Sequence, residues 1–486
     1  MNELNYHINF TLTPIIVELD VYQNDSTEDK DDNMSFTDLE KEARTWLSNV
    51  EEELNRLATL GISKKQKQLV TSQTVVTYPS VQHMKPVVYP HPFPDTIQPP
   101  AELYIHIPYC GSICTYCAYA RSAPKGSEKQ ITQYLDIMAL EIDLLRTQLG
   151  GKRFSVGSIY VGGGTPTLMS PEQMSRMLEM ININTTLEKG GEYTVEGSPD
   201  TITPELLKTI KAHGVNRISI GVESFNNDIL STVGRRHTAE DALHTLEMIR
   251  TSGIREIDID LIRGLPGATT ETVIEDLNGV MQSQVSSVTS YQYVLKPSSM
   301  DAKKAASTYD SQLTLLMHQM FILGMKRIGY NNSMVDWYVR DKRETLRHNL
   351  RKWRNQSDLI GIGMGAYGFI GAVQYQNSSK LSEYSKSLLQ GQLPIQLAVT
   401  LNTDELARRN LIFGIKTGIL RDYFSEKHGF DPLEGPWSEV LALLEKNKAV
   451  TVTANSLGLS EIGRLFADWI QMMLFSEQYA VEGFCF

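Results

Sequence analysis

The segment from Tyr104 to Cys117 reads YIHIPYCGSICTYC and places three of the chain's four cysteines, Cys110, Cys114 and Cys117, in one short loop. A structural zinc site normally has four protein ligands, and no His or Cys pair with zinc-finger spacing follows this loop. A redox dithiol needs only a C-x-x-C pair and would leave Cys110 unused. Three thiolates in one loop can instead ligate three irons of a [4Fe–4S] cluster and leave the fourth iron open. The spacing therefore favours an iron–sulfur site.

The composition describes an acidic globular chain. Among 486 residues, 46 basic side chains stand against 57 acidic ones, a net charge of −11, and 41% of the residues are hydrophobic. This length suggests one large domain with attachments, or about two to three domains. The acidic balance predicts no nucleic-acid partner. No apolar run reaches the roughly 20 residues of a membrane span. The N-terminus lacks a secretory signal and four cysteines are too few for a disulfide framework, so we expect no membrane span and a cytoplasmic protein.

Strand-like and helical segments alternate on the C-terminal side of this loop and include the strand that leads into it. Strands are expected at Leu103–Ile107, Ser158–Val161, Tyr193–Glu196, Arg217–Gly221, Ile257–Leu261 and Val288–Val294. Helices are expected at Gln130–Leu149, Pro171–Ile183, Pro204–His213, Ala239–Ser252, Glu271–Ser283 and Asp310–Gly329. This alternation is typical of a parallel α/β sheet with covering helices. Six units favour a partial (β/α)6 TIM-like barrel over an open doubly wound sheet.

Residues capable of chemistry stand at the ends of these strands. The second strand is followed by the turn GGGTPT at 162–167. The next three strands lead to Glu196, Glu223 and Asp260, and the sixth carries Tyr291 and Tyr293. Each alone has a structural explanation, as a tight turn or a helix cap. Because the carboxyl ends of parallel strands meet at one edge, their joint occurrence with the cysteine loop predicts a functional site there.

The motifs YIHIP, CxxxCxxC, GGGTPT, GVESFN and DLIRGLPG resemble those of the radical S-adenosylmethionine (SAM) superfamily, and within it the oxygen-independent coproporphyrinogen III dehydrogenase (HemN-like) branch. The resemblance runs from about Tyr104 to about Phe475. It implies a [4Fe–4S] cluster held by Cys110, Cys114 and Cys117, with SAM bound at the open iron. It also implies reductive cleavage of SAM to a 5′-deoxyadenosyl radical, with the electron coming from a donor such as flavodoxin or ferredoxin.

The resemblance also implies a set of residues around SAM. Gly162 and Gly163 would let the backbone approach the methionyl ammonium, a carboxylate would bind that ammonium, and a guanidinium the methionyl carboxylate. Asp260 matches a ribose-binding position. The expected cofactor-binding residues are Tyr104, His106, Gly162, Gly163, Thr165, Glu196, Glu223, Arg235, Asp260 and Ile262. The candidate catalytic residues are Glu223, Tyr291 and Tyr293.

Three reactions compete for this site and its small-molecule substrate. Dehydrogenases of the branch usually carry a further cysteine two residues beyond the cluster motif, where this chain has Tyr119. This departure and the aromatic segments Tyr291–Tyr293 and Tyr367–Phe369 lead us to expect class C methyl or methylene transfer. The acceptor would be an sp² carbon of an unsaturated or heteroaromatic molecule, and a second SAM molecule would be the donor. The alternatives are oxidative decarboxylation of coproporphyrinogen III, or a related tetrapyrrole reaction, and haem carriage without catalysis.

The resemblance, together with the composition and the order of the expected elements, predicts three regions. Residues 1–100 would be an N-terminal extension with an acidic linker at Asn24–Asn33, residues 101–375 the barrel, and residues 376–486 a smaller, mostly helical, winged-helix-like domain that covers the substrate. The resemblance also implies that Leu359–Val373 returns to the cofactor site, where its glycines would allow close backbone approach; the alternative is a buried strand with tight turns. Further elements are expected as follows: a helix at Phe36–Leu60, extended chain at Tyr78–Pro100, helices at Thr403–His428 and Pro436–Asn447, a hairpin at Ala449–Ser460 and a helix at Glu461–Phe475.

Overall fold

The structure is a computed structural model that describes residues 36–57, 60, 75–87, 97–117, 127–294, 311–341 and 346–480. Three features of the sequence lie outside these residues: the expected acidic linker at Asn24–Asn33, Tyr119, and the fourth cysteine, Cys485. Parts of the predicted helix at Phe36–Leu60 and of the extended chain at Tyr78–Pro100 also lie outside them. Within the described ranges, no helix combines the length and the apolar character needed to cross a membrane.

The centre of the fold is a parallel sheet that contains all six expected strands. They form consecutive parallel neighbours in chain order. Their bounds are β2 Ala101–Ile107, β3 Phe154–Gly163, β4 Thr185–Gly197, β5 Arg217–Glu223, β6 Glu256–Arg263 and β7 Ser287–Gln292. Most of their residues are buried on both faces, as in sheets covered by helices. The predicted α/β fold is confirmed.

Further strands extend both edges of this sheet. A seventh parallel strand, β10 (Leu359–Ile362), pairs with β2. Beyond it follow the antiparallel strands β11 (Tyr367–Ile370), β12 (Val373–Asn377), β13 (Ile395–Thr400) and β1 (Lys85–Pro86). The other edge ends in the antiparallel strands β9 (Trp337–Val339) and β8 (Asn331–Met334). Among the described strands the two edges do not pair with each other, so the row of strands is not closed into a barrel.

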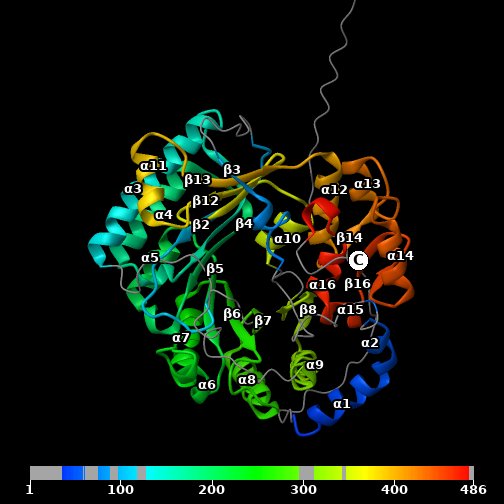
Figure 1. Cartoon of the computed structure of the whole chain (residues 1–486). Coiled ribbons are helices and arrows are strands. Elements are labelled where there is room, and N and C mark those ends of the chain that lie inside the picture. Colours follow the sequence, from blue (N-terminus) through cyan, green and yellow to red (C-terminus); the bar gives the residue numbers. More distant parts are fainter. Residues whose placement is uncertain are drawn as a thin grey trace, which may run out of the picture. The chain divides into compact units, whose positions relative to one another are not determined.

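Helices cover the outer side of the sheet, as Figure 1 shows for α3, α4, α5, α7 and α8. Their bounds are α3 Glu128–Gln148, α4 Pro171–Asn184, α5 Pro204–Ala212, α7 Ala239–Ser252, α8 Thr270–Ser283 and α9 Ser311–Arg327. A short helix that was not predicted, α6 (Asn227–Thr232), follows β5. Side-chain caps fix several helix starts, for example the reciprocal bonds between Ser127 and Gln130 at α3.

The N- and C-terminal regions differ from the prediction in their helix lengths. Instead of one helix at Phe36–Leu60, the chain forms two, α1 (Leu39–Asn49) and α2 (Glu51–Leu57). Helix α1 packs against α9. The predicted helix at Thr403–His428 is divided in two, because Gly418 adopts a positive φ of 79° and the chain forms a short strand before it resumes a helix. The predicted helix at Glu461–Phe475 divides at Phe466. The C-terminal elements are α11 Leu381–Leu389, α12 Thr403–Gly414, β14 Ile419–Leu420, α13 Arg421–His428, α14 Ser438–Lys446, β15 Val450–Val452, β16 Ser456–Leu459, α15 Glu461–Leu465 and α16 Ala467–Met473.

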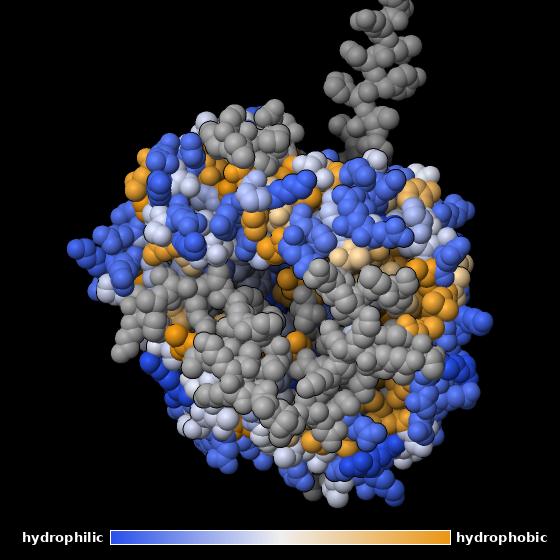
Figure 2. Space-filling model, in the orientation of Figure 1, coloured by the Kyte–Doolittle hydropathy of each residue, from blue (hydrophilic) through white to orange (hydrophobic). Residues whose placement is uncertain are grey.

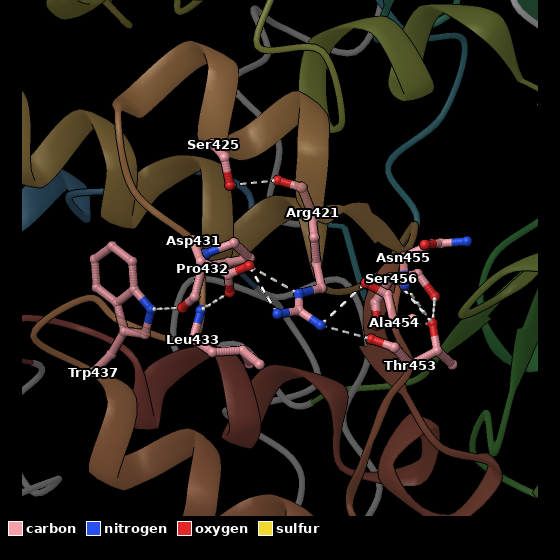
Figure 3. Close-up of polar contacts among 10 residues, drawn as sticks. All are labelled: Arg421, Ser425, Asp431, Pro432, Leu433, Trp437, Thr453, Ala454, Asn455 and Ser456. Atoms are coloured by element: carbon pink, nitrogen blue, oxygen red, sulfur yellow. Dashed lines mark hydrogen bonds and ion pairs between the residues drawn. The ribbon is translucent and has the colours of Figure 1, made fainter.

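The expected hairpin, β15 with β16, is confirmed and gains β14 as a third strand. Arg421, the first residue of α13, ties this small sheet to the helical part (Figure 3). Its guanidinium donates to Asp431 at 2.9 and 3.0 Å, and to the carbonyl oxygens of Thr453 and Ala454 at 2.9 and 3.1 Å. One side chain therefore connects the start of α13 with the turn of the hairpin.

Candidate functional site

A cavity of about 910 Å³ lies at the carboxyl ends of the parallel strands. Figure 2 shows a hollow near the centre of the view, inside the row of strands drawn in Figure 1. Every residue predicted for the site except Gly162 lines this cavity: Tyr104, His106, Cys110, Cys114, Cys117, Gly163, Thr165, Glu196, Glu223, Arg235, Asp260, Ile262, Tyr291 and Tyr293. The structure thus brings together residues from six strands and from the cysteine loop.

The cysteine loop follows β2 and is held by backbone hydrogen bonds to neighbouring loops. The N–H groups of Gly164 and Thr165 donate to the carbonyl oxygens of Ile107 and Tyr109, both at 2.7 Å. All three cysteines are half-buried and face the cavity. Within the described part of the chain, no three His, Cys, Asp or Glu side chains converge as ligands of a single metal ion would. A cluster does not require such convergence, because each of its thiolates binds a different iron.

Glu196, at the end of β4, is held by two donors. The hydroxyl of Tyr160 donates to one carboxylate oxygen at 2.6 Å, and the N–H of Gly163 donates to the other at 2.9 Å. A Cβ at Gly162 would lie 2.6 Å from a Glu196 oxygen, and one at Gly163 would lie 2.7 Å from the ring of His106. Both glycines therefore make room for neighbouring side chains, and Gly162 lies behind Glu196 rather than on the cavity wall.

Arg235 links the cysteine loop to the end of β5. One terminal nitrogen lies 3.5 Å from Cys114 Sγ and 3.6 Å from a Glu223 oxygen, and the other donates to Ser198 Oγ at 3.1 Å and to the Gly221 carbonyl. Glu223 has a φ of 72°, in the left-handed region that a non-glycine residue rarely adopts. Such strain is typical of functional sites, and it aims this carboxylate at the arginine.

Burial raises the pKa of all three strand-end carboxyl groups. For Glu196 and Glu223, the Tyr160 hydroxyl and the Arg235 charge respectively oppose this effect. For Asp260 the neighbouring Asp258 raises the pKa further. Because these acids are crowded and buried, a positively charged ligand at this edge would be attracted to them and would favour their ionised forms.

A second wall of the cavity consists of residues from later in the chain, most of which were not predicted for the site. They come from α10 (Arg347–Trp353), the β10–β12 region and α12. The side chains with polar or aromatic groups are His348, Asn349, Lys352, Trp353, Gln374, Gln376 and Arg409. The segment Tyr367–Phe369, noted for its aromatic residues, also lines this wall. No motif marks α10 or α12, so only the folded chain shows that they face the cysteine loop across one cavity.

Comparison with known proteins gives consistent matches. The model of the Radical SAM superfamily matches residues 104–278. The chain is 30% identical to the heme chaperone HemW of Lactococcus lactis, across 70% of this chain and 88% of that protein. It is 27% identical to the oxygen-independent coproporphyrinogen III oxidase of Escherichia coli, across 75% of this chain and 83% of that protein. The solved structure of coproporphyrinogen III oxidase (HemN) from Escherichia coli superimposes with a TM-score of 0.69 at 26% identity, covering 78% of this chain and 90% of that one.

Proposed function

This chain belongs to the radical SAM superfamily, in the branch that contains HemN and HemW, and from that premise we propose that it acts on a tetrapyrrole. The names of the relatives reported above refer to haem or to coproporphyrinogen III, and both molecules are tetrapyrroles. The observation that carries the proposal is the cavity of about 910 Å³, in which the cysteine loop faces an aromatic wall. Such a wall suits a planar, largely apolar substrate.

The family's cofactors are a [4Fe–4S] cluster and SAM, and the residues present fit them. We assign the cluster to the thiolates of Cys110, Cys114 and Cys117. Glu196 and Asp260 would bind the ammonium and ribose of SAM, and Arg235 its carboxylate. When bound, the cluster and SAM supply a 5′-deoxyadenosyl radical that removes a hydrogen atom from the substrate. The protein's own part is to orient the substrate at this edge and to exclude water, and Tyr291 and Tyr293 are the proposed residues beside the substrate radical.

Methyl transfer, which the sequence favoured, is not the activity named for the relatives reported above. We therefore rank oxidative decarboxylation of coproporphyrinogen III, or a related tetrapyrrole reaction, ahead of it. Haem carriage is the second candidate, because the HemW relative has 30% identity to this chain. The proposed role of the C-terminal region, residues 376–486, is to cover the substrate.

The test uses the full chain with its cluster reconstituted anaerobically, supplied with SAM, a reductant and coproporphyrinogen III. We expect 5′-deoxyadenosine together with a porphyrinogen product that has lost carboxyl groups as CO2, both measured by mass spectrometry. Release of S-adenosylhomocysteine with the deoxyadenosine would instead establish methyl transfer. Stable binding of added haem without SAM cleavage would establish the carrier function.

The cysteine assignment makes a direct prediction. Cys114→Ala should abolish the visible absorbance of the reconstituted cluster and the reductive cleavage of SAM, because the substitution removes the thiolate that binds one of the cluster's irons. Ser112→Ala, in the same loop, is the matched control and should keep both. A Cys114→Ala protein with normal iron content and normal cleavage would contradict the assignment.

A further inference from the structure

Two cations, Lys352 of α10 and Arg409 of α12, line the second wall of the cavity. Neither forms an ion pair with any residue that the structure describes, and Lys352 makes no hydrogen bond through its side chain within the same set. The acids that line the cavity, Glu196, Asp200, Glu223 and Asp260, all come from the strand-end side. Among the described lining residues from His348 onward there is no acidic side chain. The strand-end side, which also includes Arg235 and Arg236, therefore holds all the acids that line the cavity, whereas the described part of the second wall holds Lys352 and Arg409 and no acid.

Arg409 is 5% exposed, and its charge is incompletely compensated. Its guanidinium carbon lies 3.8 Å from the ring centre of Phe369 and 5.0 Å from that of Phe413. One terminal nitrogen donates to the Gln356 side chain, and Nε has no hydrogen-bond partner. Burial lowers the pKa of Arg409 to about 9, which the charge of Asp358 opposes. Asp358 itself accepts from the N–H groups of Gln98 and Gly371 and does not contact the guanidinium.

Lys352 is half-buried, and its ammonium lies 5.0 Å from the ring centre of Trp353. Burial, and after it the positive charge of Arg409, lower the pKa of this amine to about 8, while Glu102 opposes them. Two like charges that share a partly dry wall repel each other, and their burial is unfavourable unless an anion compensates them. A guanidinium and an ammonium together supply several N–H donors for carboxylate oxygens.

We infer that Lys352 and Arg409 form a binding subsite for a carboxylate of the substrate, beside the aromatic surface of Trp353, Tyr367 and Phe369. The aromatic surface would contact the apolar body of the molecule, and the two cations would bind an acidic substituent at its edge. The inference rests on the proposed function in that the substrate is taken to be a tetrapyrrole, whose propionate side chains are carboxylates. It adds which residues bind that substituent and on which side of the cavity it lies.

The experiment measures binding of coproporphyrin III, a tetraacid, and of its tetramethyl ester to the full chain by quenching of tryptophan fluorescence. The variants are Lys352→Met, Lys352→Arg and Arg409→Gln, with circular dichroism to establish that each is folded. The control is Lys446→Met, an exposed lysine of α14 that lies outside the cavity lining. We expect Lys352→Met to weaken binding of the tetraacid by about tenfold and to leave binding of the ester unchanged. Lys352→Arg should retain the affinity of the wild type. Arg409→Gln should weaken binding of the tetraacid selectively, and Lys446→Met should change the binding of neither porphyrin.

Two outcomes would overturn the subsite. One is a wild type that binds acid and ester equally, and the other is a loss in Lys352→Met that is the same for both. If the wild type binds neither porphyrin, the proposed function fails, and the subsite is then tested with naphthalene-2-carboxylate against naphthalene-2-carboxamide. A preference for the carboxylate that disappears in Lys352→Met would support the subsite without a tetrapyrrole. No preference in the wild type would overturn it.

Discussion

Gly164 follows β3 and lies directly against the cysteine loop. A Cβ at this position would lie 2.4 Å from the carbonyl oxygen of Tyr109 and 2.9 Å from Cys110 Sγ. Backbone atoms cannot move aside as a flexible side chain can, so a methyl group here must displace the loop. Gly111 lies in the same loop, and a Cβ there would meet nothing closer than 3.7 Å. Alanine at Gly111 therefore tests the loss of a glycine alone, whereas alanine at Gly164 also displaces the cluster ligand Cys110.

We predict that Gly164→Ala lowers the iron bound per chain after reconstitution severalfold, because Cys110 moves from its position. Gly111→Ala should bind iron as the wild type does. Iron and sulfide analysis with the visible absorbance of the cluster measures both variants. Equal iron contents in the two variants would show that the close packing at Gly164 does not position the cysteine.

At the scale of elements, the C-terminal region depends on a contact between a helix start and a hairpin. Arg421 binds Asp431 and two carbonyl oxygens in the hairpin turn, and its side chain is 23% exposed (Figure 3). Charge-assisted hydrogen bonds in a partly buried setting contribute more than exposed ion pairs. The pair Arg44–Glu40 on α1 offers the contrast, because its arginine side chain is 62% exposed.

Arg421→Ala should therefore lower the free energy of unfolding by about 1–2 kcal/mol, because it removes several bonds at once. Arg44→Ala should lower it by less than about 0.5 kcal/mol. Chemical denaturation of both variants beside the wild type measures the difference. If Arg421→Ala lowers the free energy of unfolding by no more than Arg44→Ala does, α13 and the hairpin are held together by apolar packing alone.

At the scale of the whole molecule, the buried carboxyl group of Glu141 on α3 joins segments far apart in the sequence. It accepts hydrogen bonds from the N–H of Gly363 at 2.8 Å and from the side chains of Asn377 and Tyr384, both at 2.5 Å. Burial raises the pKa of Glu141 to about 7, and these three donors oppose the shift. The folded chain therefore binds this proton more tightly than the unfolded chain, in which the pKa is about 4.5.

Because the folded state holds more protons between pH 4.5 and 7, this group makes the free energy of unfolding fall as the pH rises through that window. The loss attributable to Glu141 is at most about 3 kcal/mol. Glu141→Gln cannot titrate, so its stability should fall less than that of the wild type between pH 5 and pH 8. Urea denaturation at both pH values measures the two slopes, and identical slopes would show that Glu141 does not carry this dependence.

The parallel sheet and one side of the site could be predicted because their signals are local. Each strand and helix has its own apolar pattern. Cys110 follows a strand, and Glu196, Glu223 and Asp260 lie in the C-terminal halves of strands whose carboxyl ends meet at one edge. The long helix expected at Thr403–His428 is divided for a reason that is only partly local. The positive φ at Gly418 and the pairing of β14 with β16 outweighed helical periodicity.

The sequence by itself determined that this chain is a radical SAM protein, since the cysteine spacing and the strand-end motifs are sufficient for that family. Only the tertiary structure decided what faces the cysteines. Lys352 and Arg409 lie more than 200 positions along the chain from Cys117, on helices with no motif of their own. Their place beside the cavity depends on how α10 packs against the sheet and α12 against α10. Likewise, the space beside Gly162 is taken by Glu196, because β3 and β4 are neighbours in the folded sheet.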